Sequence, residues 1–175
     1  MDFMDRLYLI MMPQEGGFMK CAGIIILIIV LTASFSFSAD LKPAKPSAKD
    51  RCAVCGMFVA KYPNFLAQVL FQDGSYAFFD GSKDMFTYYL NLSKYNPSKK
   101  SSDIVAIYVT DYYSLTPLDG FKSYYVIGSN VYGPMGKELI PFEKESDAKE
   151  FMADHVGKSL LRFKEVSPGI LKGLD

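Results

Sequence analysis

Two runs of hydrophobic residues near the middle of the chain predict a β-hairpin. Residues 65–71 and 76–79 are strand-like, and Asp73 and Gly74 lie in the short polar segment between them. An Asp-Gly pair between two apolar runs is the strongest short-range signal for a two-stranded hairpin. We therefore predict two antiparallel strands joined through this turn.

A helix and a third strand are predicted to follow the hairpin. Residues 83–92 carry apolar side chains at helical spacing, namely Met85, Phe86, Tyr89 and Leu92. Asp80 or Ser82 is placed to cap the first turn of this helix. After a polar loop that contains Pro97, residues 104–109 form an apolar run typical of a buried strand. The predicted order is strand, strand, helix, strand.

The second half of the chain repeats this order. We predict strands at residues 123–127 and 138–142, a helix at 146–155 capped by Ser146, and a last strand at 159–163.

Three residues of the first half match three of the second half at one constant offset. They pair as Phe79 with Phe142, Asp84 with Asp147, and Tyr88 with Phe151. Such a match indicates a duplicated unit. We predict an α+β fold of two small ββαβ modules in tandem, at residues 51–113 and 114–175.

Residues 1–39 read as a signal peptide or an N-terminal anchor. Lys20 supplies a positive charge, residues 24–31 form an aliphatic run, and small residues that suit cleavage follow. The stretch before Met19 is acidic, so we expect Met19 to be the true start and the mature chain to begin near Asp40. The alternative is an uncleaved membrane anchor, because the apolar stretch is nearly long enough to span a bilayer.

Residues 40–50 read as a linker. Pro43 and Pro46 stand among lysine and alanine, a composition typical of a spacer. The usual bacterial lipid-attachment site is a cysteine that follows the aliphatic run, at the start of the mature chain. Cys21 precedes this run, so that site is absent.

Composition narrows the classes of partner. Half of the 175 residues are hydrophobic, and 19 Lys and Arg balance 19 Asp and Glu. The chain therefore has the composition of a globular protein and lacks the basic excess that a nucleic-acid-binding protein needs. We expect a monomer with no nucleic-acid partner.

Sulfur-containing residues gather at the start of the predicted domain. Cys52, Cys55 and Met57 follow one another closely. Side chains two apart on a strand share a face, so Cys55 and Met57 can contact one ion if this segment is extended. Cys52 needs a turn to join them. A thiolate and a thioether are soft ligands that favour Cu(I), so the sequence predicts a copper site.

Met135 is the candidate third ligand. It stands in Gly133-Pro134-Met135-Gly136, a segment with turn composition, where a large apolar side chain has little core to fill. The alternative is that Met135 fills a gap between the modules, as methionine commonly does.

Three other interpretations of the cysteine pair stay open. A redox Cys-x-x-Cys normally opens a helix, whereas Gly56 and Val59 follow here. A structural zinc site needs four nitrogen or sulfur ligands, and the mature chain offers two cysteines and one histidine. A structural disulfide between Cys52 and Cys55 is compatible with an oxidising exported compartment, and it would remove the copper thiolate.

Capping or packing explains three further polar residues of the two predicted helices. His155 stands at the end of the predicted second helix, where capping or packing explains it, with a fourth metal ligand as the alternative. Asp80 and Asp84 stand at the start of the first helix, where capping explains both.

Three motifs occur in order along the chain: Cys-x-x-Cys-Gly-Met-x-Val at 52–59, Phe-Phe-Asp at 78–80, and Gly-Pro-Met-Gly at 133–136 followed by Pro-Phe. Together they resemble the NosL family, the accessory proteins of nitrous oxide reductase assembly. The resemblance covers about residues 51–166. It implies a Cu(I)-binding chaperone of two ββαβ modules on the outer side of the cytoplasmic membrane. The implied sulfur ligands are Cys55, Met57 and Met135, and family members are usually lipoproteins, from which this chain departs.

These observations lead us to expect an exported Cu(I) carrier and no enzyme. Its partners would be a copper-donating transporter and a client copper enzyme, with nitrous oxide reductase the client that the resemblance suggests. The alternative is a thiol-based enzyme that uses Cys52 and Cys55, either a redox protein or a protein like the organomercurial lyases, whose fold resembles that of NosL. A third hypothesis is a membrane-tethered interaction module that binds no metal.

Overall fold

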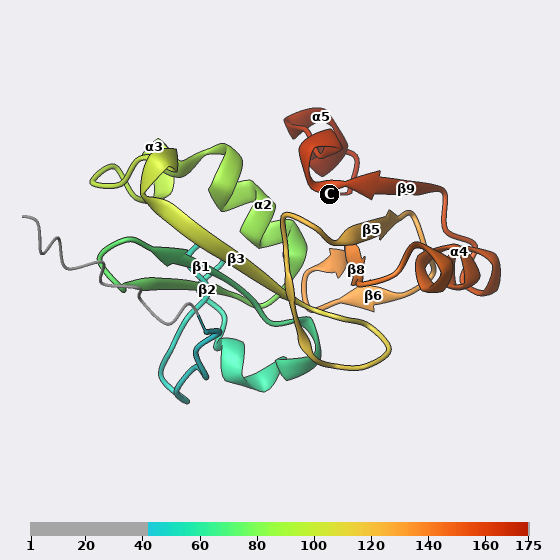
Figure 1. Ribbon diagram of the computed structural model, residues 1–175, viewed down its shortest axis with the longest axis horizontal. Helices are drawn as coiled ribbons and strands as arrows, with labels where there is room; N and C mark the ends of the chain where they lie inside the picture. Colours follow the sequence, from blue (N-terminus) through green and yellow to red (C-terminus); the bar gives the residue numbers. More distant parts are fainter. Residues whose placement is uncertain (1–41, 175) are drawn as a thin grey trace, which may run out of the picture. The chain divides into compact units, whose positions relative to one another are not determined.

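The first module is built on a four-stranded antiparallel sheet. The computed structural model describes residues 42–174, so the predicted signal or anchor segment lies outside the described residues. Strands β1 (Ala67–Phe71) and β2 (Tyr76–Phe79) form the predicted hairpin, which is confirmed. Strands β3 (Ile104–Thr110) and β4 (Pro117–Asp119) complete the sheet in the order β2-β1-β3-β4. Figure 1 shows β1, β2 and β3 side by side. The first sheet thus continues past residue 113.

The helix predicted at residues 83–92 is present but is interrupted. It consists of α2 (Ser82–Leu90) and one further turn, α3 (Leu92–Tyr95), with Asn91 between them. The prediction that Asp80 or Ser82 caps α2 is wrong, because the N-cap position is Gly81, which has no side chain. An acceptor for the first helical turn comes instead from the second module, where Glu138 accepts a hydrogen bond from the Lys83 amide.

The second module repeats the topology of the first around a three-stranded sheet. Strands β5 (Tyr124–Ile127), β8 (Ile140–Phe142) and β9 (Ser159–Arg162) lie in the order β8-β5-β9, and helix α4 (Glu145–Asp154) connects β8 to β9. In both modules the first strand lies between the second and third strands, β1 between β2 and β3 and β5 between β8 and β9. The two predicted ββαβ modules are therefore confirmed.

Short elements complete the described part of the chain, residues 42–174. A hairpin of β6 (Tyr132–Gly133) and β7 (Gly136–Lys137) is inserted between β5 and β8. The others are the 3-10 turns η1 (Val59–Lys61), η2 (Pro63–Phe65), η3 (Ser101–Asp103) and η4 (Phe163–Glu165), and the helix α5 (Pro168–Lys172).

Helix α2 lies between the two sheets and belongs to a core that they share. All five residues of β1 are buried, and α2 covers one face of this sheet while η1 and η2 lie at the other (Figure 1). The Phe86 ring on α2 also packs on Tyr125 of β5 at 5.0 Å and on Phe163 at 4.8 Å. Because both sheets pack on it, α2 buries residues on most of its surface.

The predicted linker contacts the folded domain over part of its length. The Ala44 amide donates to the side chain of Gln68 on β1 at 2.8 Å, and Gln68 donates back to the Ala44 carbonyl at 3.2 Å. The Tyr76 hydroxyl also donates to the Lys42 carbonyl at 2.8 Å. Within residues 42–174, no helix combines the length and the apolar character needed to cross a bilayer.

Helix α4 begins and ends differently from the sequence prediction. It starts at Glu145 with Lys144 at the N-cap, so Ser146 lies inside the first turn and donates to Asp147 at 2.9 Å. At the other end, the Gly157 amide donates to the Met152 carbonyl, the bond that closes a Schellman motif. Val156 occupies the left-handed position of that motif, with φ 52° and 69% exposure.

We expect Val156→Gly to stabilise the protein by about 1 kcal/mol, because a β-branched residue is strained where glycine is not. Urea unfolding of the two proteins measures the difference. Val156→Ala, which keeps a Cβ in the left-handed conformation, should recover only part of it. An unchanged or lower stability of Val156→Gly would contradict the assignment of strain to this position.

Candidate metal centre

A tight turn brings the two cysteines together. Arg51 and Phe58 form an antiparallel bridge, and the Cys52 amide donates to the Met57 carbonyl at 2.8 Å. Within this loop the Gly56 amide donates to the Cys52 carbonyl at 3.0 Å, and Gly56 has φ 78°, a conformation suited to glycine. The Cys55 amide donates to the Cys52 sulfur at 3.5 Å. The loop therefore presents both thiols on one side.

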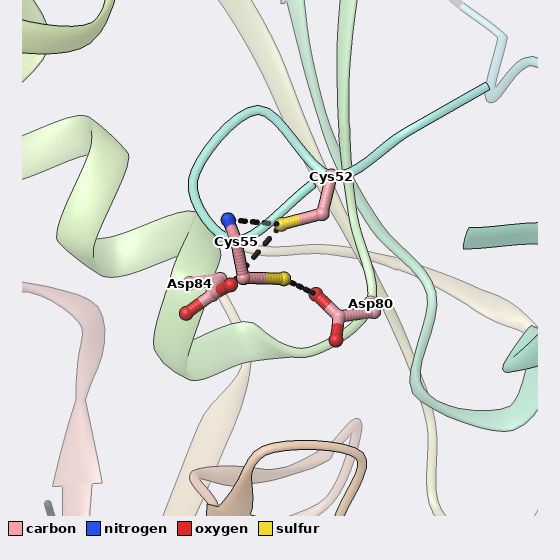
Figure 2. A group of neighbouring side chains, drawn as sticks. All are labelled: Cys52, Cys55, Asp80 and Asp84. Carbon is pink, nitrogen blue, oxygen red and sulfur yellow. Dashed lines mark hydrogen bonds between the residues drawn. The ribbon is translucent and has the colours of Figure 1, made fainter. Parts of the chain in front are cut away.

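Two aspartates of the first module face these thiols (Figure 2). The Cys55 thiol donates a hydrogen bond to Asp80 Oδ1 at 3.2 Å, and the Cys52 thiol donates one to Asp84 Oδ2 at 3.1 Å. Among residues 42–174, these four side chains form a group whose candidate ligand atoms all lie within 4.8 Å of one another. This group is the candidate metal centre.

Three separate parts of the first module position the centre. Asp80 follows the last residue of β2, and Asp84 lies in the first turn of α2. The cysteine loop is attached beside them because the Ala53 amide donates to the Phe78 carbonyl of β2 at 3.0 Å. The end of a strand, the start of a helix and a short loop thus meet at one point.

The cysteine ligands predicted from the sequence lie together, but the predicted backbone geometry is wrong. Cys55 lies in a turn and not on a strand, so alternation along a strand does not place Met57 beside it. Met57 follows the turn and is half-buried. Cys52 and Cys55 are free thiols, with no disulfide between them. That these residues share an ion stays a prediction.

Met135 lies in the turn between β6 and β7, as its surroundings in the sequence predicted. Its side chain is 45% exposed, which argues against a role in filling the core. The Lys83 ammonium group donates to the Met135 carbonyl at 3.0 Å. Because Lys83 directly precedes Asp84 on α2, this contact places the Met135 turn near the helix end that carries the centre.

The prediction that Asp80 and Asp84 act only as capping residues is wrong. Their carboxylates accept hydrogen bonds from thiols, and one oxygen of Asp80, Oδ2, is buried without a hydrogen-bond partner among residues 42–174. A buried unpaired carboxylate oxygen is costly unless a cation or another donor satisfies it. The sequence did contain one signal, two carboxylates four residues apart directly after the apolar run at residues 76–79.

Burial favours the protonated form of both thiols. Removal from water raises the pKa of Cys52 well above its ordinary value and raises the pKa of Cys55 to about 11, and the neighbouring carboxylates act in the same direction. A metal ion that binds to thiolates must therefore displace protons. Two sulfurs and two carboxylates suit a thiophilic ion, which would also satisfy Asp80 Oδ2.

The same observations argue against redox chemistry at this pair. Reactive cysteines have a lowered pKa, commonly at a helix amino terminus, whereas here the pKa of each thiol is raised. Cys55 lies in a turn that leads into η1, and it does not open an α-helix.

His155 lies apart from the four side chains of the centre. Its Nδ1 hydrogen-bonds with Asn130 at 3.1 Å, and its ring packs on Phe151 at 4.4 Å between centroids. It is also the C-cap residue of α4. The structure therefore accounts for His155 by packing and capping, as the first of the two sequence interpretations proposed.

We expect the affinity for a thiophilic ion to rise with pH, by roughly tenfold per pH unit for each thiol proton displaced. For Cys55 the rise should continue toward its pKa of about 11. Competition between the protein and a chelator for Cd²⁺ at several pH values measures this slope. The Cys52→Ser/Cys55→Ser double variant serves as the control, with weak and pH-independent binding. A flat profile for the unaltered protein would show that thiolates are not the ligands.

Comparison with known proteins agrees with the fold. The family model NosL matches residues 43–171. A protein of Stutzerimonas stutzeri, "Copper-binding lipoprotein NosL", is 30% identical over 141 residues, which cover 76% of this chain and 70% of that protein. The crystal structure of the copper chaperone NosL from Shewanella denitrificans matches with a TM-score of 0.61 at 22% identity, and the match covers 73% of this chain and 97% of that structure.

Proposed function

Because the chain belongs to the NosL family, we propose that it is an exported carrier that binds one Cu(I) ion and passes it to a copper enzyme. The observation that carries this proposal is the group of Cys52, Cys55, Asp80 and Asp84, whose ligand atoms lie within 4.8 Å of one another. Relatives of the chain are described as a copper-binding lipoprotein and a copper chaperone. Copper is the cargo of this site and not a resident cofactor.

The two thiols supply the affinity for copper. Thiolates are soft ligands and favour Cu(I) over hard ions. Each carboxylate accepts a hydrogen bond from one thiol, so an arriving cation takes the place of the thiol protons between sulfur and oxygen. The thioethers of Met57 and Met135 are the proposed additional ligands, since both are partly accessible on segments next to the centre.

The unequal burial of the two thiols supports transfer of the ion. Cys52 is 3% exposed, whereas Cys55 is only half-buried and lies nearer to solvent. A site that is open on one side exchanges ligands more readily than a closed tetrahedral cage. An incoming sulfur ligand from a partner can therefore approach on the Cys55 side while Cys52 still holds the ion.

The family and the N-terminal sequence support a proposal for the location and the partners. The relative in Stutzerimonas stutzeri is a lipoprotein, a class of exported protein. Together with the aliphatic run at residues 24–31, this favours a site of action in the periplasm or at the outer face of the cytoplasmic membrane. We assign nitrous oxide reductase as the client and a membrane transporter as the donor.

The chain acts as a carrier and not as an enzyme. The raised pKa of each thiol disfavours the thiolate nucleophile that an oxidoreductase or a lyase requires. The carrier predicts stoichiometric copper and no turnover of a disulfide or an organomercurial substrate.

We expect Cys55→Ser to lower the affinity for Cu(I) by at least about 100-fold, because a hydroxyl is a poor ligand for a soft ion. Competition with a Cu(I) chelator under reducing conditions measures the change. Ser75→Ala, in the β1–β2 turn, is the control and should bind Cu(I) like the unaltered protein. Equal affinity of Cys55→Ser and the unaltered protein would remove the basis of the proposal.

The aspartates allow a test with a matched control from the duplicated module. Asp84→Asn should weaken Cu(I) binding by about 10- to 100-fold, the usual effect of losing a ligand or its hydrogen-bond partner. Asp147→Asn alters the corresponding residue of α4, whose carboxylate accepts from the Ser146 hydroxyl and not from a thiol. It should leave the affinity unchanged. Similar losses in both variants would mean that Asp84 acts only through stability of the fold.

A further inference from the structure

Glu138 is a buried carboxylate that joins the two modules. It directly follows β7, so it belongs to the segment that also carries Met135. Its Oε1 accepts hydrogen bonds from the Lys83 amide at 2.5 Å and from the Leu139 amide at 2.9 Å. The residue is 3% exposed, and burial raises its pKa to about 8. Acidic side chains are almost never buried to this extent unless they are hydrogen-bonded or paired, so the burial of Glu138 indicates a specific role.

Glu138 supplies the acceptor that the amino end of α2 lacks locally. The amides of the first helical turn have no partner within the helix, and an N-cap side chain normally accepts from one of them. Gly81 occupies the N-cap position, and the second amide of the helix, that of Lys83, donates to Glu138 from the other module.

Two glycines make room for the Glu138 side chain. A Cβ added at Gly81 would lie 2.1 Å from Glu138 Oε2, and one added at Gly133 would lie 3.0 Å from the same atom. The carboxylate thus occupies a slot between the residue after Asp80 and strand β6. This is close contact between the metal centre's own segment and the hairpin that presents Met135.

A second link joins the same two segments. The Lys83 ammonium group donates to the Met135 carbonyl at 3.0 Å, while the Lys83 amide donates to Glu138. The backbone and the side chain of Lys83 therefore both bind the segment of the β6–β7 hairpin. The next residue, Asp84, accepts the thiol proton of Cys52 at 3.1 Å.

From this juxtaposition we infer that Glu138 is a positioning residue, which fixes the β6–β7 hairpin on α2 so that the Met135 thioether reaches the copper held by the cysteines. The inference rests on the proposed function and extends it. Glu138 itself does not touch the ion. Its contribution is to hold the Met135 thioether of the second module close to the cysteine ligands of the first.

The test compares Glu138→Ala and Met135→Leu singly and together. Each single change should lower the affinity for Cu(I) by about tenfold, and the double variant should lose no more than either one, since both remove the same ligand. X-ray absorption of the copper-loaded proteins should show one sulfur fewer around copper in all three. Glu138→Gln keeps an oxygen that can accept from the Lys83 amide, so it should restore most of the affinity.

A buried carboxylate elsewhere provides the control for a merely structural role. Asp111 is 4% exposed and accepts from the amides of Tyr113, Ser114 and Glu143 at 2.7–3.0 Å. Asp111→Asn should lower the free energy of unfolding while the Cu(I) affinity and the number of sulfur ligands stay unchanged. If Glu138→Ala does not fold, Lys83→Met removes the link to the Met135 carbonyl and should reduce the affinity in the same direction.

Several outcomes would overturn the inference. It fails if Met135→Leu binds Cu(I) normally while Cys55→Ser does not, a result that leaves the proposed function intact. It also fails if Met135→Leu lowers the affinity as much in the Glu138→Ala background as in the unaltered protein. Loss of stability in Glu138→Ala with unchanged sulfur ligation would assign it a structural role alone. Unchanged binding by Cys55→Ser would overturn both the inference and the proposed function.

Discussion

The hydrogen bond from the Lys83 amide to the Glu138 carboxylate lies where the two modules meet, at the amino end of helix α2. That helix is packed between both sheets, with Phe86 in contact with Tyr125 and Phe163 of the second module. Such burial leaves the helix little freedom to shift, because protein cores are close-packed. The positions of Asp84, and through it of Cys52, depend on how this helix end is held.

The four side chains of the candidate centre all lie in one of two modules that share the same topology. In each module a strand ends at a buried phenylalanine, Phe79 or Phe142, and a helix begins just after it with an aspartate in its first turn. Only in the first module does a cysteine loop pair with the strand before that helix, within residues 42–174. The second module differs by its inserted hairpin, which extends toward α2 of the first. A repeated framework therefore carries a site that is not repeated.

Periodicity and turn chemistry predicted most of the fold from the sequence. The Asp73-Gly74 turn and the spacing of the apolar residues led to the hairpin, to α2 and to the repeat, because these features depend on neighbours in the chain. The centre was predicted only in part. Soft-ligand chemistry identified the cysteines, whereas Asp80 and Asp84 resembled ordinary capping residues. Their contact with the thiols depends on the Ala53–Phe78 hydrogen bond, and the role of Glu138 depends on packing between modules. Neither has a local signal.

The slot around Glu138 ties together three positions that are distant in the sequence. A methyl group at Gly81 would strike the carboxylate, and one at Gly133 would crowd it. During divergence these sites would be expected to change together, since Glu138 disfavours a side chain at position 81 and crowds one at position 133, and a smaller residue at 138 would relax both restrictions. Covariation among positions 81, 133 and 138 in an alignment would then indicate the contact between the modules, even in sequences in which the cysteine loop has diverged.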